Sequence, residues 1–194
     1  MGTVSSSGAV LLNERILAFH KKYSGIKFEI FEGNTFNLID LLNKGIIEVG
    51  IVRTPFKTTG FECKYAAPEP MVAAMSRELD WQPGNEIISV SSLKDQPLIL
   101  YRRFVQLISE TCLEHGFEPD VFCKTDDART ALLWANAGLG VALLPRSAFG
   151  LAANRNLIFK EIASEKLQTQ ITAIWVKGRY LSSLAEKFIE NFEG

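Results

Sequence analysis

The sequence predicts an α/β fold made of two βαβαβ lobes, and three observations lead to this prediction. Short strand-like stretches alternate with helix-like stretches along the 194-residue chain. The same order of elements occurs twice, once in the first third of the chain and once in its middle. Glycine or proline ends most of the stretches. Because strands that alternate with helices form parallel sheets with right-handed crossovers, each repeat is expected to form one lobe.

The first repeat begins at the N-terminus. Its predicted elements are a strand ending at residue 4, a helix over 8–23, a strand over 26–31, a helix that follows residue 34, and a strand over 49–52. Helical spacing of apolar residues predicts the first helix, and alternation of apolar with charged residues predicts the strand after it. Asn34 or Thr35 is expected to cap the second helix, and Gly45 to end it.

The second repeat has the same order. Its predicted elements are a strand over 98–101, a helix over 104–115, a strand over 121–123, a helix ending near 137, and a strand over 141–144. Gly116 and Gly138 end the two helices, and Asp126 or Asp127 is the expected N-cap of the second one.

The segments outside the repeats are less regular. Strand-like pieces are expected within 61–76, a loop at 81–85, a short helical turn at 91–95, and a strand over 171–176. Ser183 and Glu186 have the spacing of a capping box that begins a last helix. This last strand and helix can complete either lobe.

Composition limits the partners of the chain. Its formal net charge is −1, from 21 basic and 22 acidic residues, whereas modules that bind nucleic acid usually carry a clear basic excess. Three cysteines are too few for a disulfide framework. No apolar run approaches the ~20 residues that span a bilayer, and no signal peptide is evident. A cytoplasmic protein that binds neither membrane nor, by itself, DNA is expected.

Catalytic and metal-binding patterns are not evident in the sequence. Cys112, His115 and Cys123 lack the spacing and the fourth ligand of a zinc site. There is no Gly-x-Ser-x-Gly elbow and no phosphate loop, and the two glycines at 138 and 140 follow a helix, which is the wrong order for a dinucleotide fingerprint. We therefore expect a binding module and no enzyme, with no catalytic residue, metal or cofactor.

A ligand is expected at the carboxyl ends of the strands, because open α/β sheets bind ligands there. Those ends are residues 5–7, 32–35 and Arg53 in the first lobe, and residues 101–104, 125–127 and Arg146 in the second. Serine, asparagine and threonine before a helix are caps first, although a cap can also touch a ligand. Arg53 at a strand end is either a ligand contact or only a surface or interlobe ion-pair residue. Arg102 and Arg103 point oppositely on an extended segment, so at most one is expected to face the ligand.

Six segments, in this order, resemble the effector-binding domain of LysR-type transcriptional regulators. They are residues 2–7, 19–26, 33–52, 93–101, 135–145 and 181–189, which together cover the chain from end to end. The strongest is 135–145, Ala-Asn-Ala-Gly-Leu-Gly-Val-Ala-Leu-Leu-Pro.

The resemblance implies two Rossmann-like lobes of the type-2 periplasmic-binding-protein kind, joined by two crossover strands. Lobe I would comprise residues 1–70 and 173–194, and lobe II residues 71–172. It also implies a homodimer of this domain, a tetrameric parent protein, and a winged helix-turn-helix that this chain lacks and through which the parent binds DNA. Together with the strand-end arginine, it places the effector contacts at the following residues: Ser5, Ser6, Asn34, Thr35, Arg53, Tyr101, Arg102, Arg103 and Phe104.

The functional hypothesis is a sensing domain that holds a small anionic metabolite, first of all a carboxylate, in a cleft between the lobes. Arginines and helix N-termini at the strand ends favour an anion. A solute-binding protein of a transporter shares the fold and is the main alternative, although the chain is short for that class. A small enzyme on two α/β lobes is the third hypothesis, and it lacks an evident base and nucleophile.

Overall fold

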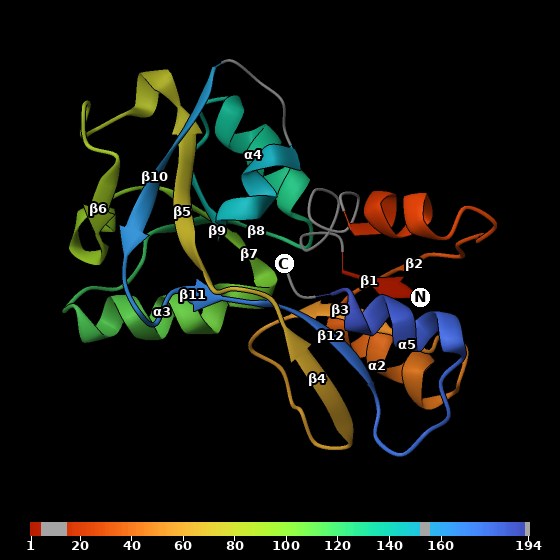
Figure 1. Ribbon diagram of the computed structural model, residues 1–194. Coiled ribbons are helices and arrows are strands. Elements are labelled where there is room, and N and C mark those ends of the chain that lie inside the picture. Colours follow the sequence, from red (N-terminus) through yellow and green to blue (C-terminus); the bar gives the residue numbers. More distant parts are fainter. Residues whose placement is uncertain (5–14, 152–155, 193–194) are drawn as a thin grey trace. The chain divides into compact units, whose positions relative to one another are not determined.

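The computed structural model describes residues 1–4, 15–151 and 156–192 (Figure 1). It divides into two compact units. Unit 1 comprises Met1–Pro68 and Thr169–Gly194, and unit 2 comprises Glu69–Gln168. Each unit has its own mixed sheet covered by helices, which confirms the predicted α/β class.

The sheet of unit 1 has five strands in the order β2-β1-β3-β12-β4. The strands are β1 (Gly2–Thr3), β2 (Phe31–Glu32), β3 (Gly50–Arg53), β4 (Phe61–Tyr65) and β12 (Ile171–Val176). β1 pairs in parallel with both β2 and β3, whereas β12 is antiparallel to β3 and β4. The final strand of the α/β pattern, β12, thus completes unit 1.

Helices cover both faces of this sheet. On one face, Leu38 and Leu42 of α2 (Thr35–Asn43) are fully buried in a cluster with Val52 of β3. The other face packs against the helix at residues 15–22 and against α5 (Ser183–Glu190). Both faces of the central strands β3 and β12 are therefore largely buried, which explains their mostly apolar composition.

The sheet of unit 2 follows the order β6-β10-β5-β9-β7-β8, and β11 pairs with β5 beside it. The strands are β5 (Glu69–Ser76), β6 (Ile87–Ser89), β7 (Leu98–Tyr101), β8 (Val121–Thr125), β9 (Val141–Pro145), β10 (Leu157–Ala163) and β11 (Gln168–Thr169). β7 is parallel to β8 and β9, while β5 is antiparallel to β9 and β10.

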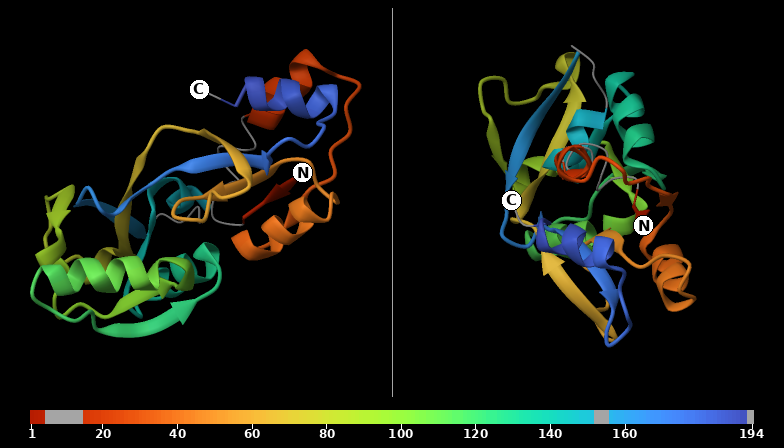
Figure 2. Two further views of the ribbon diagram at one scale, coloured as in Figure 1. Left: turned by 90° about the horizontal axis from the view of Figure 1, so that it is seen from below. Right: turned by 45° about the vertical axis from the view of Figure 1, so that its right-hand side comes forward.

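The two faces of the central strands of unit 2 meet different helices (Figure 2). Alternate residues of β7 and β9 pack with α3 (Val105–Glu114) and with α4 (Ala128–Asn136). Short 3₁₀ turns complete the unit, namely η1 (Arg77–Leu79), η2 (Val90–Leu93), η3 (Arg102–Phe104) and η4 (Arg146–Leu151). Among the described helices, none combines the length and apolarity needed to cross a membrane.

Two expectations from the sequence need correction, and two strands were missed. The strand predicted over 26–31 is paired only at Phe31–Glu32. α5 is capped by Ser182 and not by Ser183, because the Ser182 hydroxyl accepts a hydrogen bond from the Ala185 N–H at 3.3 Å. β6 and β10 were not predicted at all. In the described part of the first predicted helix, residues 15–22 are helical, and its beginning lies outside the described residues.

Gly140, just before β9, lies very close to the backbone at the entry of β7. Its φ is +159°, and a Cβ placed there would overlap the carbonyl oxygen of Pro97 and lie 3.3 Å from the Ile99 side chain. The neighbouring N–H of Val141 donates to that same carbonyl at 2.8 Å. Only glycine lets β9 begin so close to the entry of β7.

Gly140→Ala should therefore lower the free energy of unfolding by about 3 kcal/mol or more, because the Pro97 carbonyl cannot move without breaking the start of two strands. Gly116→Ala is the matched control, since Gly116 has a φ of +80° but a Cβ added to it would meet nothing within 4 Å. That variant should lose only the ~1–2 kcal/mol that a left-handed backbone costs an alanine. Urea denaturation of both variants measures the difference, and equal losses would contradict the close approach.

Candidate functional site

The carboxyl ends of three parallel strands share one edge of the sheet in each unit. In unit 1 these are β1, β2 and β3, which end at Thr3, Glu32 and Arg53. In unit 2 they are β7, β8 and β9, which end at Tyr101, Thr125 and Pro145. The predicted site residues that are described stand at these ends or follow them closely, so each unit brings its own group of them to one edge.

In unit 1, the edge carries the beginning of α2. Asn34 is the N-cap, and its side-chain oxygen accepts a hydrogen bond from the Asn37 N–H at 2.9 Å. Thr35 is the first helical residue and is buried. No acidic residue lies in the first turn, so the positive end of the helix dipole has no carboxylate of its own element. Ser5 and Ser6, the other predicted contacts of unit 1, lie outside the described residues.

Arg53 is completely buried at the end of β3, with 0 % of its surface exposed. Its Nη1 donates a hydrogen bond to Thr169 Oγ1 at 2.9 Å, and the neighbouring Thr54 hydroxyl accepts one from the Gln170 N–H at 2.8 Å. The surface position weighed for this arginine is therefore wrong. A guanidinium keeps its charge under all ordinary conditions, so Arg53 places a fixed positive charge inside unit 1.

In unit 2, the residues after β7 form the η3 turn and are not extended. The expectation that Arg102 and Arg103 point oppositely, as on a strand, therefore does not apply. Tyr101 and Phe104 are both buried, and their rings meet edge to face with centroids 5.5 Å apart. Phe104 is fully buried and belongs to the cluster under α3. These two aromatic residues thus hold the turn in place.

The two arginines of this turn have different partners. Arg102 is exposed, and its Nε lies 2.6 Å from Asp126 Oδ1 in an ion pair that is open to solvent. The Arg103 guanidinium stands over the Phe104 ring, 5.5 Å from its centroid. An exposed ion pair contributes at most about 1 kcal/mol, so an anionic ligand can compete with Asp126 for Arg102.

Asp127, and not Asp126, caps α4. The Asp127 carboxylate accepts from the Arg129 N–H at 2.7 Å, and the Thr125 hydroxyl donates to the Asp127 carbonyl at 3.0 Å. The N-terminus of α4 is thus already matched by a negative charge. This resolves the alternative that the sequence left open between the two aspartates.

Sequence reasoning missed one further charged group at the edge of unit 2. Glu69 accepts hydrogen bonds from the Ser147 N–H at 2.6 Å and from the Ser147 hydroxyl at 2.8 Å. Because Met71 pairs with Pro145, Glu69 stands at the carboxyl end of β9. Glu69 and Ser147 are 78 residues apart, and no local spacing in the sequence signals their pairing.

The cysteines and histidines of the described chain form no metal centre. No group of three or more His, Cys, Asp or Glu side chains stands close enough to hold an ion within the described ranges. His115 Nδ1 contacts the Thr111 carbonyl at 2.8 Å, at the end of α3. The Cys112 thiol is fully buried, and burial raises its pKa to about 11.

Cys112 should resist alkylation in the folded protein, because its raised pKa leaves it almost wholly protonated at pH 8 and only the thiolate reacts. With iodoacetamide at that pH, the half-exposed Cys123 should react at least about 10-fold faster, as followed by mass spectrometry. In urea the two rates should converge. Equal rates in the folded protein would contradict the assigned burial.

These observations define an α/β binding module whose polar and cationic residues gather at the carboxyl ends of parallel strands. The family model described as the LysR substrate binding domain matches residues 1–193. The chain therefore belongs to the LysR substrate-binding domain family, as its sequence resemblance implied.

Two curated relatives illustrate the match. The chain is 26 % identical over 186 residues to the HTH-type transcriptional regulator AlsR of Bacillus subtilis, covering 91 % of this chain and 58 % of AlsR. It is 23 % identical over 190 residues to BsdA of the same organism, covering 95 % of this chain and 65 % of BsdA. The chain thus spans about three fifths of the length of these regulators.

Solved structures show the same fold. The effector-binding domain of BenM with its effector benzoate superposes with a TM-score of 0.82 at 20 % identity, covering 98 % of this chain and 88 % of that one. Full-length CbnR in complex with its target DNA gives 0.84 at 20 % identity, covering 98 % of this chain and 67 % of that one. The periplasmic-binding-protein-like fold expected from the sequence is confirmed.

Proposed function

We propose that this chain is the effector-sensing domain of a bacterial LysR-type transcriptional regulator and that its effector is a small anion, first of all a carboxylate. The observation that carries the proposal is the family match over residues 1–193, joined to the arginines at the strand ends. In this proposal the effector touches the carboxyl edges of β1–β3 and of β7–β9, where ligands of open α/β sheets bind.

Charge at these edges favours an anion. Buried Arg53 brings a fixed positive charge to unit 1, and α2 begins there under the neutral cap Asn34. In unit 2, α3 begins at Val105, just after the η3 turn that carries Arg102 and Arg103, and has no acidic residue in its first turn. Among the helices whose N-termini are described at these edges, α2 and α3 have no carboxylate in their first turn, whereas α4 has its cap Asp127. A helix N-terminus without a carboxylate attracts anions.

The relatives supply the wider context. Benzoate, the effector of the BenM domain, is a carboxylate. CbnR has been solved with its target DNA, and this chain covers 67 % of it. By analogy, we propose that the parent of this chain also binds DNA through a winged helix-turn-helix outside the 194 residues. The formal net charge of −1 agrees with that division of labour.

The anion site is tested by single alanine substitutions at Ser6, Thr35, Arg53, Arg102 and Arg103. The effector is first identified by a thermal-shift screen of metabolites. Loss of a good hydrogen bond to a charged group should then weaken its binding by about 10- to 150-fold in calorimetry. Asp126→Asn should have the opposite effect. It removes the side-chain carboxylate that competes with the ligand for Arg102, so a carboxylate effector should bind more tightly.

Arg129→Gln is the control for the arginine variants, because Arg129 is paired with Asp127, the N-cap of its own helix α4. It should leave the affinity unchanged. If all five alanine variants bind the effector as tightly as the unsubstituted chain does, or if the effector is neutral or cationic, the anion proposal is wrong.

We further propose that the chain forms a homodimer and its full-length parent a tetramer. An exposed apolar patch on unit 2 supports self-association. Leu133 and Trp134 of α4 are 62 % and 39 % exposed, and the Trp134 ring lies 6.4 Å from that of Phe122 on β8. Leu132, the third apolar residue of this stretch, is fully buried and belongs to the core instead. A two-fold interface is self-complementary and closes at two copies.

Leu133→Asp should weaken the dimer, because it places a charge in an apolar contact. Sedimentation equilibrium should show the unsubstituted 194-residue chain as a dimer and this variant shifted toward the monomer. Leu113→Asp is the matched control, since Leu113 on α3 is similarly exposed at 55 % but lies outside the patch. The proposal would be contradicted if the unsubstituted chain were a monomer at tens of micromolar, or if both substitutions had equal effects.

A further inference from the structure

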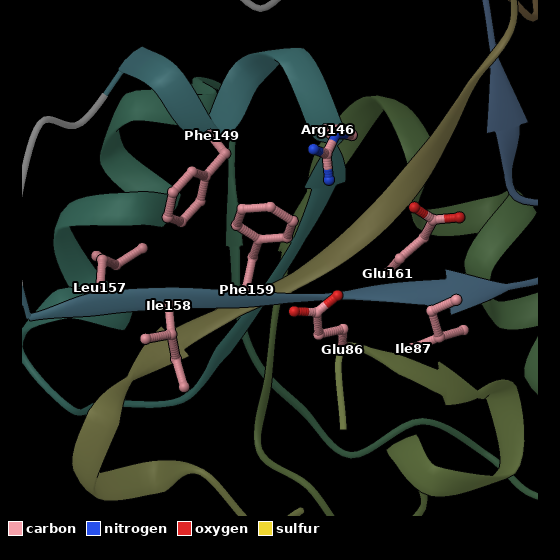
Figure 3. A pocket seen from close by; sticks show the side chains of 8 residues that line it. All are labelled: Glu86, Ile87, Arg146, Phe149, Leu157, Ile158, Phe159 and Glu161. Carbon is pink, nitrogen blue, oxygen red and sulfur yellow. The ribbon is translucent and has the colours of Figure 1, made fainter. Parts of the chain in front are cut away.

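A groove lies wholly within unit 2 (Figure 3). It lies beside β10 and the start of β6, which are at the end of the sheet opposite β8. Its volume is about 630 Å³. It is lined by residues of β10, of the η4 turn and of the chain that enters β6, namely Glu86, Ile87, Arg146, Phe149, Leu157, Ile158, Phe159 and Glu161. None of these residues is among the nine effector contacts predicted above, although Arg146 directly follows the carboxyl end of β9.

The register of the sheet explains why the groove exists. β6 pairs with β10 only from Glu161 to Ala163. The first residues of β10 pair with β5 on one side, and β6 does not reach them on the other. A stretch of strand edge is therefore left open beside Phe159, with Glu86 at the point where β6 begins.

The open edge also presents backbone polar groups. The Glu161 N–H points toward β6, where it donates to the Glu86 carbonyl at 2.8 Å. Backbone groups alternate in direction along a strand, so the N–H and carbonyl of Phe159, two residues earlier, point the same way. One donor and one acceptor thus face the groove, close together on a single residue.

The apolar part of the groove is built from aromatic rings. Phe149 of η4 and Phe159 of β10 lie with ring centroids 4.6 Å apart at 59°. Leu157 continues the same face of β10, because side chains two apart on a strand point to the same side. Figure 3 shows the Phe149, Phe159 and Leu157 side chains gathered at one end of the groove.

Three charged side chains surround this apolar part. The Arg146 guanidinium stands over the Phe159 ring, 4.8 Å from its centroid. Within the described part of the chain, Arg146, Glu86 and Glu161 make no side-chain hydrogen bond or ion pair with one another or with other residues. Figure 3 places the two carboxylates on either side of β10 and the guanidinium above it. The groove thus offers positive and negative charge beside an apolar floor.

The wall that carries Glu86 is held rigidly. Lys160, between Phe159 and Glu161, points to the other face of β10 and is only 3 % exposed. Its Nζ donates to the carbonyls of Gln82 and Asn85, both at 2.7 Å, and lies 3.0 Å from the Asp80 carboxylate. A buried ammonium with three such partners fixes the loop that leads to Glu86, so the groove is formed before any ligand arrives.

We propose that this groove binds a free α-amino acid with an apolar side chain, at a site separate from that of the effector. The ligand carboxylate pairs with Arg146 and the Phe159 N–H, and the ligand ammonium with Glu161, Glu86 and the Phe159 carbonyl. The apolar side chain lies on Phe149 and Leu157. Every charge of the groove and of the ligand then has a partner of opposite sign.

Simpler ligands fit less well. An organic anion satisfies Arg146 but meets two carboxylates, Glu86 and Glu161. An organic cation satisfies the carboxylates but is repelled by Arg146. Only a molecule with both charges a few bonds apart matches a groove in which a guanidinium and two carboxylates share one aromatic floor.

The test is a titration of the ¹⁵N-labelled chain with three matched probes: L-leucine, 3-methylbutylamine, which lacks the carboxylate, and 4-methylpentanoate, which lacks the ammonium. The amides of Ile87, Phe149 and Phe159 should shift with L-leucine, with a dissociation constant on the order of 1 mM because the groove is open and the ligand small. Each truncated probe should bind about 5-fold or more weakly, the effect of losing one exposed ion pair.

Two variants locate the charges. Arg146→Met should reduce the affinity for L-leucine about 5-fold while leaving that for 3-methylbutylamine unchanged or higher. Glu161→Gln should also reduce the affinity for L-leucine, while leaving that for 4-methylpentanoate unchanged or higher. Lys124→Met and Glu118→Gln, which change charges on or just before β8, at the opposite edge of the sheet, should alter neither. Dispersed spectra verify that each variant is folded.

The proposal is overturned if no groove amide shifts at about ten times the expected dissociation constant, or if the three probes bind alike. It is also overturned if the groove amides respond only to protein concentration, which would mark them as a contact between copies. Because the probes are read at groove amides and the effector variants at the carboxyl edges, failure here leaves the proposed effector site untouched, and the reverse also holds.

Discussion

The hydrogen bond from the Val141 N–H to the Pro97 carbonyl, 2.8 Å long, sets the start of two neighbouring parallel strands. It aligns Leu98 with Val141 and Leu100 with Leu143, so that β7 and β9 end at the same edge. A slip of one residue would turn every buried side chain of these strands to the other face. The turn after β7 and the turn after β9 are therefore brought together by a contact at the far end of both strands, where only Gly140 leaves room for it.

Elements with a clear local signal could be predicted from the sequence. β7 and β12 have the predicted bounds, because each is a short apolar run between turn residues. β10 escaped prediction because Lys160 interrupts its apolar pattern, although this lysine is buried and satisfied by a loop some 75 residues away. β2 is shorter than the strand predicted from the alternation of apolar and charged residues over 26–31. Only Phe31 and Glu32 pair with β1.

The same distinction holds for the candidate site. The caps of α2 and α4 could be narrowed to two adjacent residues each, and the structure selects Asn34 and Asp127, because the partner of a cap lies only two or three positions away. The partners of Arg53 and Glu69 could not, since Thr169 and Ser147 lie 116 and 78 residues distant. Whether Arg102 and Arg103 share a side depended on a 3₁₀ turn that neither residue type specifies. The arginines and aspartates of the site were therefore predictable, whereas the presence of Glu69 at the site and the pairing of these charges are properties of the fold.

The central claim is that this chain holds a small anion at the carboxyl ends of its parallel strands. Chemical-shift mapping of the ¹⁵N-labelled chain with a set of carboxylates, matched to their neutral amides, tests it most directly. We expect that at least one carboxylate, and not its amide, shifts the N–H signals of Thr35 and Phe36 at the start of α2 and of Arg102–Phe104. Carboxylates that shift only signals elsewhere, or amides that bind as well as their acids at these residues, would contradict it.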